Sequence, residues 1–153
     1  MFDAALLRLL TPDERAEYDL LTGPDPSAYR DEPVGYARDV LGVSLTPAQE
    51  AILRGLAIPP RKVLVPSAHS QGKTFIAAVA TSWWYDSFDP GVVLTTAPTK
   101  RDVVDLLWAE VRVLRSRAGL PSPFTGPRAP EMFGHDRHYA KGFTASTGEG
   151  FKG

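Results

Sequence analysis

The chain has 153 residues, enough for one domain with its own core, and its 43% hydrophobic and 23% charged content is ordinary for a globular protein. The absence of cysteine excludes disulfides, thiolate metal sites and cysteine nucleophiles. A formal net charge of -1 is unlike a strongly basic nucleic-acid module, so any DNA contact must come from local patches or from further segments. With neither a signal-peptide pattern nor an apolar run of about 20 residues, we expect a cytoplasmic protein outside the membrane.

The N-terminal third is predicted to be helical. Thr11, Pro12 and Glu14 form a capping box with proline at the first helical position, and this helix should end at Gly23. Residues 1–33 are therefore interpreted as a helical N-terminal segment.

Two further helices are expected before residue 60. Residues 36–41 predict a short helix closed by Gly42. Thr46 and Gln49 repeat the capping-box pattern and predict a helix over residues 46–56, which a proline pair then ends.

The pattern then changes to strand, helix, strand, helix. Residues 63–65 and 92–96 are continuously apolar or β-branched, as in buried strands. Residues 75–84 predict a helix, and a long helix capped by Thr99 carries apolar side chains at helical spacing to Leu114. This alternation predicts an α/β fold with a parallel sheet. After a proline-rich loop, residues 138–146 alternate loosely and are interpreted as another strand.

A phosphate-binding loop is the clearest functional motif. It follows the first predicted strand and opens the next helix, the context that such a loop requires. Its residues are Ser67, Ala68, His69, Ser70, Gln71, Gly72, Lys73 and Thr74. Backbone N–H groups would wrap the β-phosphate of ATP at the positive end of the helix. Lys73 would reach the β- and γ-phosphates, and the Thr74 hydroxyl would coordinate Mg²⁺. Ser67 replaces the usual first glycine.

Several segments together resemble the large terminase subunits of tailed bacteriophages, the ATP-driven motors that package DNA. The likeness runs from about Tyr36 to the C-terminus. It is carried by residues 45–49, 65–75, the pair Trp83 and Trp84, residues 93–99, residues 107–110 and the tail 141–153.

The resemblance implies a P-loop NTPase of the additional-strand (ASCE) type, a parallel sheet flanked by helices, with residues 34–153 as the N-terminal part of its ATPase domain. It implies ATP and Mg²⁺ as cofactors and an adenine contact for Gln49, which the capping box alone would also explain. It further implies double-stranded DNA, a portal and a small terminase subunit as partners, and a homo-oligomer in the full-length motor.

The sequence departs from the family in three ways. His69 stands where many terminases carry an arginine, no apolar strand ending in Asp-Glu is present, and the nuclease domain is missing. Neither Asp86 nor Glu110 has a context that suits the acidic role. We therefore expect an N-terminal fragment, inactive alone, whose sheet would not be stable by itself. The family's fold implies that residues 63–65 and 92–96 are not neighbours and would expose unpaired edges and apolar faces.

Two other functions share these motifs. A superfamily-2-type helicase, or another nucleic-acid-dependent ATPase, has the same order of glutamine, loop and Thr-Ala-Pro-Thr. A non-catalytic, truncated nucleotide-binding fragment is the third alternative.

The remaining conspicuous residues are interpreted structurally. At least two of Trp83, Trp84 and Trp108 are expected in the core or at a domain interface rather than stacked on bases. A solvated helix face is favoured for Arg112, Arg115 and Arg117, and metal binding by His135 and His138 is weakly supported because their loop fixes no geometry.

Overall fold

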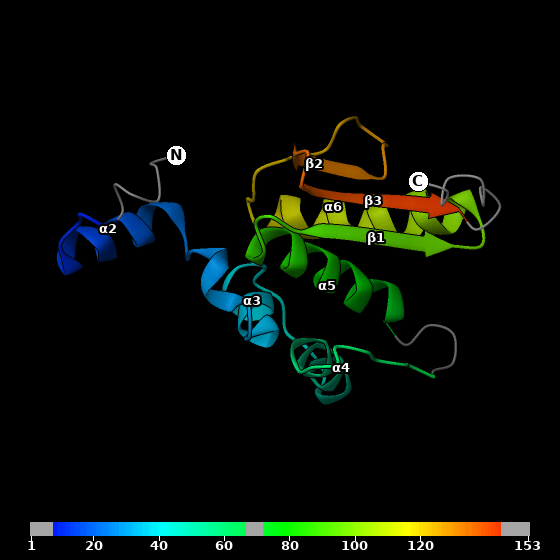
Figure 1. Cartoon of the computed structure of the whole chain (residues 1–153), viewed down its shortest axis with the longest axis horizontal. Coiled ribbons are helices and arrows are strands. Elements are labelled where there is room, and N and C mark those ends of the chain that lie inside the picture. Colours follow the sequence, from blue (N-terminus) through cyan, green and yellow to red (C-terminus); the bar gives the residue numbers. More distant parts are fainter. Residues whose placement is uncertain (1–7, 67–71, 145–153) are drawn as a thin grey trace.

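The computed structural model describes residues 8–66 and 72–144. It is a mixed α/β structure in which several helices precede a small sheet and others pack against one of its faces (Figure 1). Its helical elements are α2 (Pro12–Thr22), η1 (Pro26–Tyr29), α3 (Pro33–Asp39), α4 (Pro47–Ala57), α5 (Lys73–Ser87), the π-helical η2 (Asp102–Leu107) and α6 (Trp108–Arg117). Its strands are β1 (Val92–Ala97), β2 (Glu131–His135) and β3 (His138–Thr144).

The predicted helix starts are confirmed by their hydrogen bonds. At α2, the Glu14 carboxylate accepts from the Thr11 N–H at 2.8 Å and the Glu14 N–H donates to the Thr11 hydroxyl. Thr46 and Gln49 form the same reciprocal box at α4. Gly23 and Gly42, expected to close helices, both have positive φ angles, as such positions require.

The sheet has three strands in the order β1-β3-β2. β1 runs parallel to β3 and β2 runs antiparallel to it, so the sheet is mixed rather than wholly parallel. The predicted strand at residues 92–96 is confirmed as β1, and the one at residues 138–146 is confirmed as β3 as far as Thr144, since residues 145 and 146 lie outside the described residues. β2 lies in the stretch that was expected to be loop.

The predicted strand at residues 63–65 is wrong for this structure. Residues 61–66 have no regular secondary structure, and Leu64 is 91% exposed. A strand needs a hydrogen-bonded neighbour, and within the described residues β1 pairs with β3 alone and not with this segment. Because residues 63–65 form no strand here, the expected order of the two segments in a sheet stays a prediction, as does the instability of the isolated sheet.

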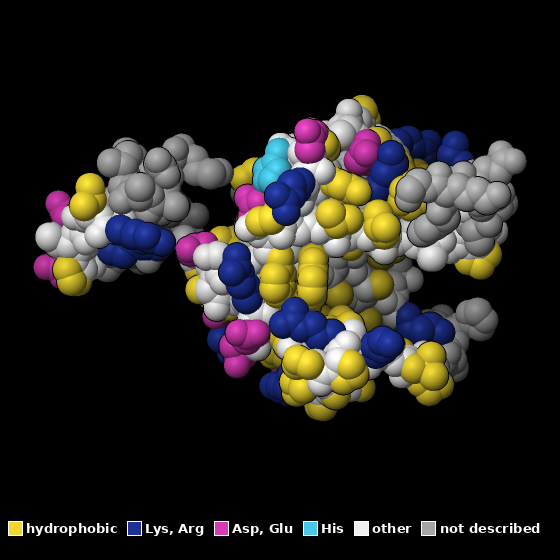
Figure 2. Space-filling view, in the orientation of Figure 1, with side chains coloured by type: hydrophobic (Ala, Val, Ile, Leu, Met, Phe, Trp, Pro, Cys, Tyr) yellow, Lys and Arg dark blue, Asp and Glu magenta, His cyan; other side chains and the backbone are white. Residues whose placement is uncertain are grey.

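One face of the sheet is covered and the other is exposed. α5, η2 and α6 pack against the covered face, where Trp108 is fully buried and its indole N–H donates to the Thr95 hydroxyl at 2.9 Å. On the opposite face, Val92 and Phe133 are exposed on either side of Tyr139, with which both are in register, and Leu94 is exposed further along β1. Apolar side chains lie over the sheet on the face that Figure 2 shows.

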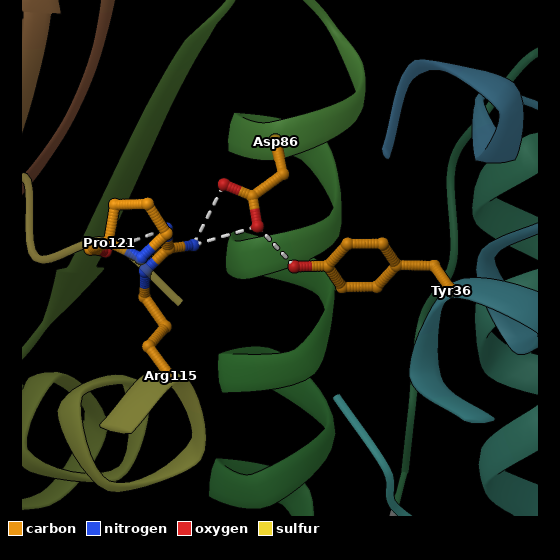
Figure 3. Close-up of polar contacts among 4 residues, drawn as sticks. All are labelled: Tyr36, Asp86, Arg115 and Pro121. Atoms are coloured by element: carbon orange, nitrogen blue, oxygen red, sulfur yellow. Dashed lines mark hydrogen bonds and ion pairs between the residues drawn. The ribbon is translucent and has the colours of Figure 1, made fainter. Parts of the chain in front are cut away.

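A buried polar network joins three helices (Figure 3). The Arg115 guanidinium of α6 bonds both carboxylate oxygens of Asp86 in α5 at 2.9 Å, and the Tyr36 hydroxyl of α3 donates to the same carboxylate at 2.5 Å. Burial, and then the charge of Asp86, raises the pKa of Tyr36 far above its usual value, so the phenol keeps the proton that it donates.

The interpretation of Arg115 as solvated is therefore wrong, because its side chain is 4% exposed. Arg112 is also engaged, with its guanidinium donating to the carbonyls of Gly126 and Ala129. Arg117 alone of the three is exposed as expected. Helical spacing placed these cations along one helix but could not show which of them meets a carboxylate from α5.

Candidate functional site

The start of α5 is the candidate phosphate site. Gly72 is its N-cap residue with φ 73°, and Lys73 and Thr74 occupy the first turn with exposed side chains. No side chain in the described residues caps this helix end, in contrast to α4. The 15-residue α5 thus has its positive dipole end at Gly72, with Lys73 and Thr74 in the turn that follows. Ser67, Ala68, His69, Ser70 and Gln71 lie outside the described residues, so their expected roles stay predictions.

Gln49 lies beside this helix end. Its Oε1 accepts from the Thr46 N–H at 3.0 Å within the capping box. Its Nε2 points the other way and lies 2.8 Å from the position that a Cβ on residue 72 would take. The capping-box explanation of Gln49 is therefore confirmed. Its amide nitrogen lies outside the capping box and points toward Gly72. The positive φ of residue 72 favours glycine, and a Cβ there would have to displace the Gln49 amide, the far end of a flexible side chain.

An apolar groove of 540 Å³ begins at the same place. It runs between α4 and the 61–66 segment on one side and α5 and β1 on the other, with Lys73 among its lining residues. Its walls include Ile52, Leu56, Val63, Val65, Val92 and Leu94. The unpaired edge of β1 and the unpaired extended segment thus face a common apolar space.

No carboxylate lines this groove, so the described residues offer no acidic pair for Mg²⁺ or water beside Lys73. Asp86 is held by Arg115 and Tyr36, and it lies near the opposite end of α5 from Lys73. Glu110 is on α6. The judgement that neither residue suits the acidic role agrees with these positions. Residues 8–66 and 72–144 likewise contain no group of three or more His, Asp or Glu side chains placed to hold a metal ion.

The aromatic residues have mainly structural positions. Trp83 and Trp108 are buried, as expected, and the Trp83 indole N–H donates to the Tyr29 carbonyl at 2.7 Å. Trp84 is partly exposed and stacks on Phe88 at 4.2 Å between ring centroids. His138 is buried against the Tyr85 ring, and the exposed His135 bonds Asp89 at 2.8 Å.

None of the helices in residues 8–66 and 72–144 has the length and apolar character that crossing a bilayer requires. Comparison of the chain with protein-family models, with curated proteins and with solved structures finds no match.

Proposed function

We propose that the start of α5 binds the phosphates of ATP. The observation that carries this proposal is the uncapped helix end at Gly72, with Lys73 and Thr74 in its first turn and the Gln49 amide beside it. The N-terminus of a helix favours an anion, because the helix dipole is positive there and the N–H groups of the first turn point outward along the axis. A lysine ammonium and a threonine hydroxyl are the groups that a triphosphate and its Mg²⁺ require.

The residues in the site have separate roles under this proposal. Lys73 neutralises charge on the β- and γ-phosphates, and the Thr74 hydroxyl is a ligand of the bound Mg²⁺. Gln49 keeps its Oε1 in the capping box while its Nε2 donates to a nucleobase acceptor, so the cap and the adenine contact are compatible.

Beyond ATP binding, we propose that the chain is the ATP-binding part of a DNA-packaging motor of the terminase type. This step rests on the resemblance in the sequence. Hydrolysis additionally needs an acidic pair, which the resemblance implies on a further strand. The chain alone should therefore bind Mg-ATP without turning it over.

Mg-ATP should raise the thermal stability of the chain, whereas Lys73→Ala should remove this effect. Saturation at 100-fold over the Kd stabilises a folded state by about 2.7 kcal/mol, since the ligand binds the native state and not the unfolded one. The measurement is a thermal-shift titration with Mg-ATP. Each protein is compared with and without nucleotide, so that a change in ligand-free stability caused by Lys73→Ala does not affect the comparison of the shifts. An equal shift in both proteins, or none in the parent, would refute the phosphate site.

A further inference from the structure

A second cleft lies where β1 and β3 end, at a place the phosphate site does not use. It has a volume of 750 Å³ and is formed by the start of η2, the loop at residues 128–130 and the last residues of β3. In α/β sheets, ligands commonly bind beyond the carboxyl ends of the parallel strands. β1 and β3 are the parallel pair of this sheet.

The cleft is positively charged although the chain is not. Three cations, Lys100, Arg101 and Arg128, and one carboxylate, Asp105, line it, so 3 − 1 gives a formal charge of +2. Arg128 bonds Asp105 at 2.6 Å in an exposed pair. Lys100 and Arg101 are exposed and form no ion pair with any other described residue. Figure 2 shows Lys and Arg side chains gathered at this end of the sheet.

The floor of the cleft is held in place by close packing. A Cβ on Gly142 would lie 2.5 Å from the Trp108 Nε1 and 2.6 Å from the Val103 Cγ1, so the backbone of β3 touches η2 directly. η2 itself is π-helical, a rare conformation that often occurs at functional sites. This packing holds the start of η2, which directly follows Lys100 and Arg101, against the end of β3.

The rim cations also lie at a helix start. Thr99 accepts from the Asp102 N–H at 3.1 Å, and η2 continues into α6 with its positive end toward Lys100 and Arg101. Two unpaired cations and a helix dipole directed at one cleft suit a ligand that carries phosphates in series.

We propose that this cleft binds the phosphate backbone of DNA. The choice of DNA as the ligand rests on the proposed packaging function, whereas the charge and shape of the cleft do not depend on the phosphate loop. Contacts of this kind are independent of base sequence and lose affinity as salt rises, because bound cations release counterions from the DNA.

Binding of a fluorescently labelled 20-base-pair duplex, followed by anisotropy between 50 and 200 mM salt, tests the proposal. The parent chain should bind with an affinity that falls with salt. Lys100→Gln/Arg101→Gln should weaken binding about 10-fold or more at 50 mM salt and lower the slope of log K against log salt by about 2, one unit for each lost phosphate contact.

The control removes the same charge elsewhere. Arg38→Gln/Arg137→Gln, at exposed positions outside the cleft, should keep the parent affinity within about 2-fold. An equal loss in the control would show that net charge alone matters and would overturn the proposal, as would failure of the parent to bind the duplex at 50 mM salt.

Two further measurements distinguish this cleft from the phosphate loop as the DNA site, and DNA from an acidic protein as the ligand. Lys73→Ala should still bind the duplex even if it no longer binds Mg-ATP, so failure of the phosphate site leaves this result intact. Loss of duplex binding in Lys73→Ala would instead place the DNA at the phosphate loop and contradict the cleft. Polyglutamate at equal charge concentration should displace the duplex poorly, and equal displacement would indicate an acidic protein partner instead.

Discussion

Replacing Arg115 with leucine should lower the free energy of unfolding by about 3–5 kcal/mol. The change leaves the Asp86 carboxylate in the interior, 9% exposed, with Tyr36 as its remaining partner in the network. A buried charge without its counterion is among the largest single destabilising effects, since total stabilities are about 5–15 kcal/mol. Urea unfolding followed by tryptophan fluorescence measures the loss, because Trp83 and Trp108 are both buried.

Two variants control this experiment. Arg117→Leu, two residues further on the same helix and exposed, should change stability by less than about 0.5 kcal/mol. Asp86→Asn combined with Arg115→Leu removes both charges and should recover most of the loss, since the neutral amide oxygen can still accept from Tyr36. A loss below about 1 kcal/mol in Arg115→Leu would show that the network does not hold the three helices together.

Gly72→Ala should reduce Mg-ATP affinity about 10-fold or more, equivalent to at least about 1.4 kcal/mol. A methyl group there would lie 2.8 Å from the Gln49 Nε2 and would disfavour the left-handed conformation that begins α5. Both effects displace the helix end and the amide that are proposed to meet the nucleotide. Isothermal titration calorimetry of each variant gives the affinity.

Gly119→Ala is the matched control for this change. Gly119 has a φ of 66°, close to that of Gly72, but nothing lies within 4 Å of its Cβ position. The two variants should share a backbone strain of about 1–2 kcal/mol, and Gly119→Ala should keep the parent affinity. Equal affinity in both would mean that the contact between Gln49 and Gly72 has no part in binding.

Features encoded by neighbouring residues could be predicted from the sequence. The capping boxes at Thr11 and Thr46 depend on side chains three positions away, and their hydrogen bonds have the expected form. Glycine closes helices for an equally local reason, as at Gly23 and Gly42. The strand at residues 92–96 was also recognisable, because a run of β-branched residues bounded by turn residues favours a strand over a helix.

Features that depend on distant residues could not be predicted. Residues 63–65 have the composition of a buried strand, but a strand forms only when another strand lies beside it. The burial of Arg115 depends on Asp86, 29 positions earlier in the chain. β2 was missed because its five residues include a glycine, a glutamate and a histidine, and it is stabilised by pairing with β3.

The candidate site was predictable in its chemistry and less so in its surroundings. The order Gly72, Lys73, Thr74 predicted that these residues begin a helix, and they lie at the start of α5. The approach of Gln49 to Gly72 depends on the packing of α4 beside α5. The charged cleft brings together residues 100, 101, 103–105, 128, 130 and 142–144. Neither arrangement has a signal in any single stretch of sequence.

The most direct test of the central claim is a titration of the ¹⁵N-labelled chain with Mg-ATP, observed by ¹H–¹⁵N nuclear magnetic resonance. The claim predicts saturable shifts of the backbone amides of Gly72, Lys73 and Thr74 and of the Gln49 side-chain amide. Shifts confined to other residues, or no saturable shift at all, would contradict a nucleotide site at the start of α5.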